Sequence, residues 1–193
     1  MMTIKDVMTP CGYLWVGFIV IWLIWGIRSK PVQTHEGVSS RLSYAVLNLA
    51  AFYLMFAGDI PRAWLRLRFL PASLWMEVLG VALTAAGLGF AVWARAYLGG
   101  NWSSSVTVKV GHELVRSGPY RWVRHPIYSG MVLAMFGTAL ERREVRGLIA
   151  VALLYAGFKI KSRIEEQAMV ATFGPQYAEY MSTTGAILPR LRW

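Results

Sequence analysis

The stretch Arg116–Gly130, RSGPYRWVRHPIYSG, gathers arginine, histidine, tyrosine and tryptophan side chains directly before an apolar segment. Pro126 is well placed as the first residue of a helix, where its missing N–H costs nothing. Tyr128 and Gly130 then lie on the first helical turn, where unpaired backbone N–H groups can meet an anion. With His125 beside that turn, the pattern predicts a site for a ligand that carries a carboxylate or a phosphate.

The same residues also allow a purely structural interpretation. Arginine, tyrosine and tryptophan are common anchors at a membrane interface, and a single histidine there is more often a satisfied polar group than a catalyst. The three histidines, His35, His112 and His125, do not have the spacing of metal ligands, so we expect no metal site. The choice between a ligand site and membrane anchors depends on whether other polar residues lie close to this stretch in the folded chain.

A second charged segment, KIKSRIEEQ, follows an apolar run in the C-terminal part of the chain. Lys161 and Glu165 are four residues apart, and Arg163 and Glu166 are three apart, spacings that pair charges along one helix. Taken alone, the segment is typical of a solvated helix. Because it continues directly from an apolar run, we expect its charges at the membrane face, where they share one cavity with the Arg116–Gly130 stretch.

The elements that must position these residues have the composition of membrane helices. Of 193 residues, 56% are hydrophobic and nine are tryptophan, which is typical of an integral membrane protein. Small residues recur four, three and four positions apart at Gly80, Thr84, Gly87 and Ala91, a spacing that lets another helix approach closely. We predict an all-α integral membrane protein with about five transmembrane helices, at residues 11–28, 42–58, 73–98, 126–140 and 145–160.

The net charge of +10 resides mainly in the connections between the apolar runs. Basic residues in such positions meet membrane lipids and orient the chain, so we do not expect a nucleic-acid partner. A cytosolic C-terminus places 13 of the 20 basic residues on the cytosolic side, which favours a multi-pass protein of the cytoplasmic membrane with a cytosolic active site. The single cysteine, Cys11, excludes an internal disulfide.

The polar segment before Arg116 has the pattern of a short strand. Valines at positions 106, 108 and 110 alternate with Thr107 and Lys109, and Gly111–His112 can turn the chain before Leu114–Val115. We predict a short β-hairpin-like loop on the cytosolic face.

The last apolar run is predicted to continue beyond the membrane as a C-terminal helix. The run at 145–160 proceeds without a break signal to residue 173, and Gly174–Pro175 then ends it. We treat residues 1–193 as a single domain.

Two long segments taken together resemble a known family. HELVRSGPYRWVRHPIYSG, followed after two apolar runs by RIEEQAMVATFGPQYAEY, resembles the isoprenylcysteine carboxyl methyltransferase family and its bacterial relatives. The family pattern HxLVxxGxYxxxRHPxYxG, then EE, then FGxxYxxY, is matched at every fixed position. A fragment such as RHP is weakly specific, but the ordered set is strongly specific and favours the ligand site over the anchors.

The resemblance implies an S-adenosylmethionine-dependent methyltransferase at the membrane–cytosol interface, with its cofactor-binding half at about residues 95–189. The acceptor it implies is lipophilic, an isoprenylcysteine-type carboxylate or a related small carboxylate or thiol. We assign cofactor binding to Lys109, His112, Leu114, Val115, Tyr120, His125, Pro126, Tyr128 and Glu165. The candidate catalytic residues are Lys161, Arg163 and Glu165.

One position departs from the family. Its substrate-facing arginine, four residues before the glutamate, is Lys161 here, and lysine lacks the bidentate fork that suits a carboxylate. Arg163 could replace it only from another face of the helix. Transfer of a methyl group from a sulfonium to a carboxylate or thiolate needs no general base, so positioning and exclusion of water would supply most of the rate.

Two alternatives remain at this stage. Membrane sterol and enone reductases have similar C-terminal halves but bind NADPH, whose three phosphates would require more arginines in the cavity. A non-enzymatic membrane accessory protein would use both polar clusters only to anchor its helices.

Overall fold

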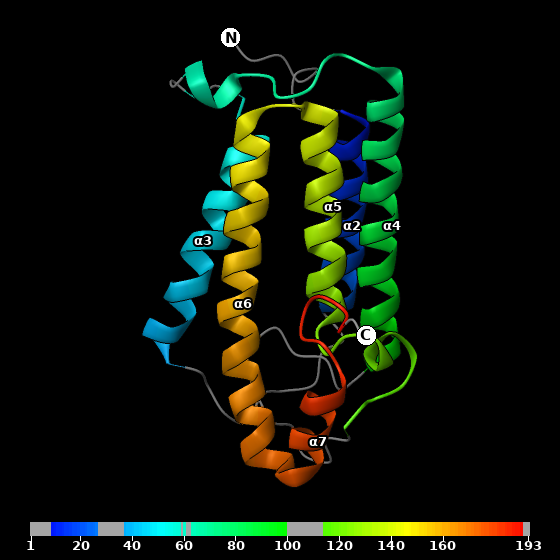
Figure 1. The fold of residues 1–193 in the computed structure, drawn as a ribbon, viewed down its shortest axis with the longest axis vertical. Coiled ribbons are helices and arrows are strands. Elements are labelled where there is room, and N and C mark those ends of the chain that lie inside the picture. Colours follow the sequence, from blue (N-terminus) through cyan, green and yellow to red (C-terminus); the bar gives the residue numbers. More distant parts are fainter. Residues whose placement is uncertain (1–8, 27–36, 59, 61–62, 100–113, 191–193) are drawn as a thin grey trace.

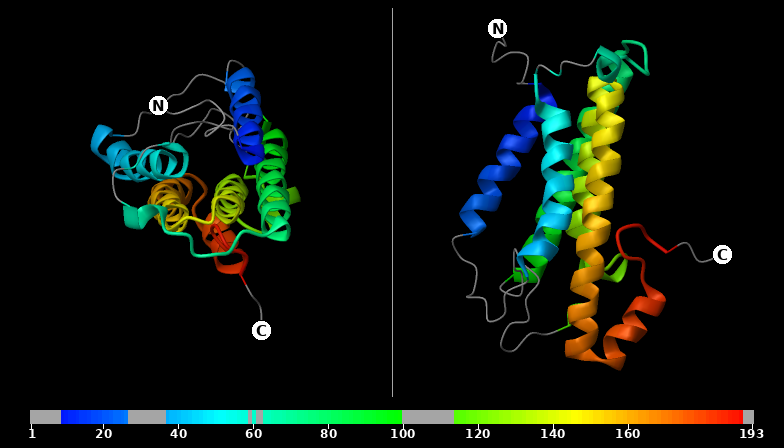
Figure 2. Two further views of the ribbon diagram at one scale, coloured as in Figure 1. Left: turned by 90° about the horizontal axis from the view of Figure 1, so that it is seen from above. Right: turned by 90° about the vertical axis from the view of Figure 1, so that its left-hand side faces the viewer.

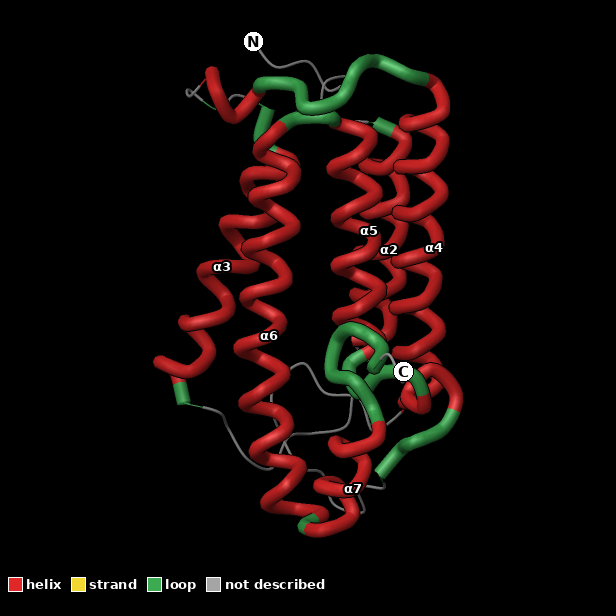
Figure 3. Tube along the Cα trace, in the orientation of Figure 1, coloured by secondary structure: helices red, strands yellow, loops and turns green. Residues whose placement is uncertain are grey.

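The computed structural model describes residues 9–26, 37–58, 60, 63–99 and 114–190. Within these ranges the chain is mainly helical and contains no extended strand, only two isolated backbone bridges, Arg68–Glu144 and Val123–Gly185 (Figure 3). The all-α prediction is therefore confirmed for the described residues. The first arm of the predicted hairpin, its turn, and the candidate residues Lys109 and His112 lie outside them.

The helices form a bundle whose long axes run together, with one short helix folded back at one end (Figure 1). In Figure 2, α3 lies beside α6, and α2 lies beside α4 on the other side of the bundle. The α-helices are α2 (Pro10–Gly26), α3 (Val38–Phe56), α4 (Leu74–Leu98), α5 (Pro126–Arg142), α6 (Val145–Phe173) and α7 (Pro175–Thr183). Two 3-10 turns, η1 (Ala63–Arg66) and η3 (Gly118–Arg121), lie in the connections.

Local signals set where the functional helices begin and end. Pro126 is the first residue of α5, as predicted, and α6 continues beyond its apolar part to Phe173. Gly174 then adopts a positive φ of 53°, which glycine tolerates without steric cost, and Pro175 starts α7. The helix extension that the sequence predicts is present.

One described helix, α4, is long and apolar enough to cross a membrane by length and composition, and α2 is a shorter apolar helix. The count of about five spans therefore stays a prediction. Large apolar side chains are exposed along three helices, including Val16, Val20, Leu23 and Ile24 of α2, Leu42, Val46 and Leu49 of α3, and Leu74, Trp75, Val78 and Leu79 of α4.

Helices α4 and α5 approach each other along a seam of small residues. The stripe predicted on α4 faces Gly130, Ala134 and Gly137 of α5. A Cβ on Gly80 would lie 2.7 Å from the carbonyl oxygen of Gly137, and one on Gly137 would lie 2.6 Å from the backbone nitrogen of Thr84. The backbones of the two helices are thus in direct contact, which only glycine permits here.

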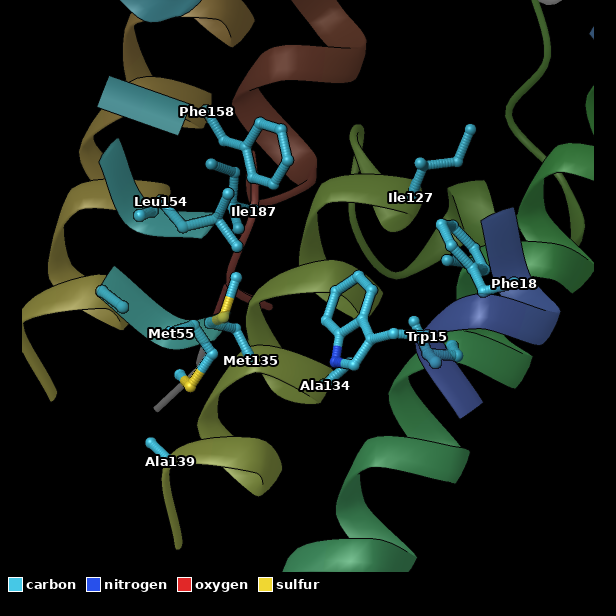
Figure 4. Close-up of a cluster of buried hydrophobic side chains, with 14 of the residues drawn as sticks. Trp15, Phe18, Met55, Ile127, Ala134, Met135, Ala139, Leu154, Phe158 and Ile187 are labelled. Atoms are coloured by element: carbon cyan, nitrogen blue, oxygen red, sulfur yellow. The ribbon is translucent and has the colours of Figure 1, made fainter. Parts of the chain in front are cut away.

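Buried side chains join the other helices to this pair. Figure 4 shows Trp15 and Phe18 of α2, Met55 of α3 and Phe158 of α6 gathered around α5. The indole Nε1 of Trp15 also donates to Thr138 Oγ1 of α5 over 3.0 Å. Helix α5 therefore lies at the centre of the bundle.

Replacing Gly80 with alanine tests the seam. The added methyl group would meet rigid backbone of α5, so we expect a loss of about 1–3 kcal/mol in the free energy of unfolding. Gly89→Ala on the same helix is the matched control, because a Cβ there meets nothing within 4 Å. It should be neutral or stabilising by up to about 1 kcal/mol, since alanine favours helix. Equal melting temperatures of the two variants in detergent would contradict a tight seam.

Candidate functional site

A histidine at the start of α5 lies between two carboxylates of α6. The Nδ1 atom of His125 is 3.3 Å from Glu165 Oε2, and its Nε2 atom is 3.1 Å from Glu166 Oε1. The His125 and Glu166 side chains are about nine-tenths buried, and Glu165 is four-fifths buried. An imidazolium has two N–H donors on opposite sides of the ring, so a single ring can serve both carboxylates.

Glu166 has a second cationic partner in the residue before the histidine. The Nε and Nη2 atoms of Arg124 both lie 2.8 Å from Glu166 Oε1. The same guanidinium donates to the carbonyl oxygens of Met181 and Thr184, beyond α6. Arg124 thereby ties α6, the end of α7 and the entry to α5 together.

An aromatic stack lines the Glu165 side of this arrangement. The ring of Tyr128 is nearly parallel to those of His125 and Phe158, with centroids 5.4 Å and 4.5 Å away. The Tyr128 hydroxyl donates to Glu165 Oε1 over 2.6 Å. Glu165 therefore sits at the edge of an apolar, aromatic wall, with donors from two residues of α5.

The family's arginine position, Lys161, faces the same group. Its Nζ is 4.0 Å from Glu165 Oε1 and lies 5.5 Å from the ring centroid of Tyr128 and 5.4 Å from that of Tyr44 on α3. Arg163 lies on the exposed side of α6, and the described part of the chain contains no ion pair of its guanidinium. The structure thus brings Lys161, and not Arg163, to Glu165.

These contacts shift the pKa values of all three buried ionisable groups. Burial by itself would lower the pKa of His125, but hydrogen bonds to Glu165 and Glu166, with their charges, hold it above its ordinary 6.5. Burial would raise the pKa of each carboxyl, yet hydrogen bonds from His125 lower both, with further help from Lys161 and Arg124. The pKa of Glu166 falls to about 2. The shifts favour the protonated form of the histidine and the ionised form of both carboxyls.

The segment after α7 returns to cover the start of α5. The backbone N–H groups of Arg124 and His125 donate to the carbonyls of Gly185 and Ala186 over 2.8 and 3.0 Å. Ile187 is buried in the core, and its carbonyl accepts from the Ser129 hydroxyl. The two amides that precede the helix are thus bound by the chain itself, and the predicted free donors of the first helical turn stay a prediction.

The remaining predicted cofactor residues that the structure describes are wholly or partly buried. Pro126 is fully buried at the first position of α5, and Val115 packs against the hydrophobic core. Tyr120 is buried in η3, where its hydroxyl donates to the Ala94 carbonyl at the end of α4 over 3.3 Å. Leu114 is half-buried. Tyr120 thus holds η3 against the end of α4.

Four residues join the site that sequence reasoning did not assign to it: Arg124, Glu166, Tyr44 and Phe158. The first two belong to the RHP and EE motifs, so the motif itself carried the signal. Nothing local marks Tyr44 or Phe158, because each is an aromatic residue within an apolar helix. We name the seven residues Tyr44, Arg124, His125, Tyr128, Lys161, Glu165 and Glu166 the polar cluster.

Comparisons with known proteins agree with the motif. The sequence model of the phospholipid methyltransferase family matches residues 75–176, which include α4, α5 and the polar cluster apart from Tyr44. The chain is 30% identical over 122 residues to the cobalt-zinc-cadmium resistance protein CzcN of Cupriavidus metallidurans, covering 63% of this chain and 51% of that protein. It is 31% identical over 115 residues to the protein-S-isoprenylcysteine O-methyltransferase of Saccharomyces cerevisiae, covering 58% and 48%.

A solved structure of the eukaryotic intramembrane Ras methyltransferase, isoprenylcysteine carboxyl methyltransferase, aligns with a TM-score of 0.42 at 22% identity. The alignment covers 95% of this chain and 68% of that one. The chain spans about half the length of the two curated relatives. The family model and the yeast relative confirm the sequence resemblance to the isoprenylcysteine carboxyl methyltransferase family.

The stability of the protein should depend on pH through the polar cluster. The low pKa of Glu166 stabilises the fold above its ordinary 4.5, and this contribution is lost as pH falls towards 2. The raised pKa of His125 stabilises the fold below 6.5, and this contribution is lost as pH rises through the raised value. Both contributions are complete only between about pH 4.5 and 6.5.

Melting curves of the wild type, Glu166→Gln and His125→Gln, recorded from well below pH 4.5 to well above pH 6.5, measure the loss of each contribution. We expect Glu166→Gln to cost on the order of 3 kcal/mol above pH 4.5, since one pKa unit corresponds to about 1.4 kcal/mol, and to cost less in acid. The deficit of His125→Gln should shrink above pH 6.5 instead. If the loss in the free energy of unfolding of each variant did not change with pH, the charges of the two residues would not stabilise the fold.

Proposed function

The chain belongs to the phospholipid methyltransferase family, and from this we propose that it is an S-adenosylmethionine-dependent methyltransferase of the membrane–cytosol interface. The observation that carries the proposal is the convergence of the two motif segments. Arg124, His125 and Tyr128 meet Lys161, Glu165 and Glu166 in one buried group, although the segments are about forty residues apart. Anchors at an interface would have no reason to converge in this way.

The membrane location is supported by what the helices expose. Large apolar side chains such as Val20, Leu49 and Val78 are about half exposed or more on three different helices. Water-exposed apolar surface on this scale is unfavourable, whereas lipid tails would cover it. With five spans, the polar cluster and the C-terminal segment would lie together on the cytosolic side, as the distribution of basic residues also favours.

The charges of the polar cluster fit a cofactor that carries a carboxylate. Three basic side chains, Arg124, His125 and Lys161, gather around the carboxylates of Glu165 and Glu166. We propose that Arg124 and His125, at the start of α5, hold the carboxylate of the ligand.

The aromatic wall fits the rest of such a cofactor. S-adenosylmethionine, when bound, supplies a methyl group made electrophilic by a positively charged sulfonium. The faces of Tyr128 and Phe158 attract a cation, and Glu165 beside them adds a full negative charge. These side chains orient the ligands and exclude water, and no side chain needs to remove a proton from a carboxylate or thiolate acceptor.

We propose that the acceptor is lipophilic and anionic, an isoprenylcysteine-type carboxylate or a related small acid or thiol. Lys161 would meet its charge, because its ammonium lies between α3 and α5 beside Tyr44 and Tyr128. Arg163 is exposed on another face of α6 and would take no part. The name of the yeast relative, an isoprenylcysteine O-methyltransferase, supports this class of acceptor.

Calorimetric titration of the detergent-purified protein with S-adenosylhomocysteine tests the cofactor. We expect micromolar binding, and a loss of on the order of tenfold or more in His125→Ala and Tyr128→Phe, because each removes a charge-assisted hydrogen bond. Tyr53→Phe is the matched control, since that tyrosine is 61% exposed on α3.

NADPH, titrated beside it, distinguishes the alternative enzyme class. Binding of NADPH alone would make the chain a reductase. Binding of neither ligand by folded protein, or wild-type affinity in both site variants, would contradict the proposal.

Steady-state kinetics with a farnesylated cysteine acceptor test the role of Lys161. Lys161→Gln should raise KM for the acceptor by about tenfold or more while S-adenosylhomocysteine still binds, because the cation that meets the carboxylate is lost. Lys161→Arg should retain most activity and Arg163→Gln should match the wild type. The reverse result, with only Arg163→Gln impaired, would transfer the role to Arg163.

A further inference from the structure

A hollow lies beside the segment that follows α7. It measures about 690 Å³, within the roughly 300–1,000 Å³ typical of ligand sites, and is open to the outside. It is bounded by α4, η3, α7 and the segment that follows α7. Of its lining, the argument uses Phe90, Arg116, Arg121, Trp122, Glu179 and Arg190. We call this hollow the basic groove.

One end of the basic groove is aromatic and reaches into the apolar part of α4. Phe90 is eight residues, roughly 12 Å, before the end of that helix. The Trp122 ring stacks on Phe90 at 6.4 Å and meets Trp93 edge-on at 5.8 Å. Both tryptophans are more than two-fifths exposed. Exposed tryptophans at the end of an apolar helix are typical of the boundary between lipid tails and headgroups.

The other end of the groove is basic. Three arginines line it against a single carboxylate, Glu179, which is 3.4 Å from Arg116. Arg121 is exposed and has no ion pair among the described residues. Arg190 is also exposed and donates to the Ser182 carbonyl. The groove therefore carries an excess of positive charge that the neighbouring protein groups do not neutralise.

No residue of the polar cluster lines the basic groove. Neither Glu165 nor Lys161 is among the lining residues, so a molecule held in the groove lies apart from them. The segment Thr184–Ile187 binds the backbone of Arg124 and His125 and the hydroxyl of Ser129, and its Thr184 lines the groove. Its occupant must be sought apart from the cofactor and the acceptor.

We propose that the basic groove binds one anionic phospholipid, which stays unreacted. Arg121 and Arg190 hold the headgroup phosphate, and Phe90 and Trp122 contact the upper part of an acyl chain. The occupant is identified by the two kinds of lining, aromatic rings packed on the apolar part of α4 and exposed arginines, which together match a lipid with a negative headgroup. The proposal rests on the membrane location and not on the methyl-transfer chemistry.

Native mass spectrometry of the full chain in detergent tests this, with phosphatidylglycerol and phosphatidylcholine of identical chains as probes. We expect the wild type to retain phosphatidylglycerol in preference, and Arg121→Gln/Arg190→Gln to lose that preference by about tenfold or more. Arg66→Gln/Arg68→Gln is the matched control, because both arginines are exposed at the opposite end of the bundle (Figure 1). Arg121→Lys/Arg190→Lys preserves the charge and should retain the lipid.

Equal retention of phosphatidylglycerol by the two double glutamine variants would overturn the proposal. A second arm adds inorganic phosphate at constant ionic strength: displacement of the lipid at low millimolar phosphate would show a free-anion site instead. All variants are expected to keep the wild-type melting temperature and S-adenosylhomocysteine affinity. Absence of S-adenosylhomocysteine binding in the wild type would refute the proposed function and leave the lipid result standing.

Discussion

Two adjacent carboxylates on a largely apolar helix impose the main constraint on this fold. Glu165 and Glu166 are neighbours, so their side chains leave α6 about 100° apart and cannot share one simple counterion. His125 satisfies both because its two ring nitrogens face opposite ways, while Arg124 and Lys161 add one further cation to each. Burial of these charges is tolerable only when the start of α5 lies against the extension of α6.

The rest of the bundle keeps that contact in place. The glycine seam fixes α5 against α4 at backbone distance, so α5 has little freedom to slide. Tyr120 ties η3 to the end of α4, and the segment after α7 binds the backbone of Arg124 and His125. The charged group thus rests on elements held by packing and by backbone hydrogen bonds, which is the rigidity that precise positioning of a methyl donor and acceptor would need.

The polar cluster and the basic groove lie at the same end of the molecule, but their environments differ. In the polar cluster, cations and carboxylates are buried and almost fully paired, which suits selective recognition of a small charged ligand. In the basic groove, arginines are exposed beside aromatic rings, which suits a headgroup at the lipid boundary. The two share no residue.

The sequence by itself determined the features that depend on neighbours along the chain. It predicts the start of α5 at Pro126, the end of α6 at Gly174 and the small-residue stripe of α4, because these follow from backbone geometry and helical spacing. The spacing along α6 also predicts the Lys161–Glu165 pair, which is present, but tertiary structure decided the pairings between helices. Glu166 binds Arg124 and His125 instead of Arg163, although the spacing along α6 also allowed the latter. The sequence also could not predict that Tyr44 joins the polar cluster or that the segment after α7 covers the start of α5. Both depend on how distant segments pack.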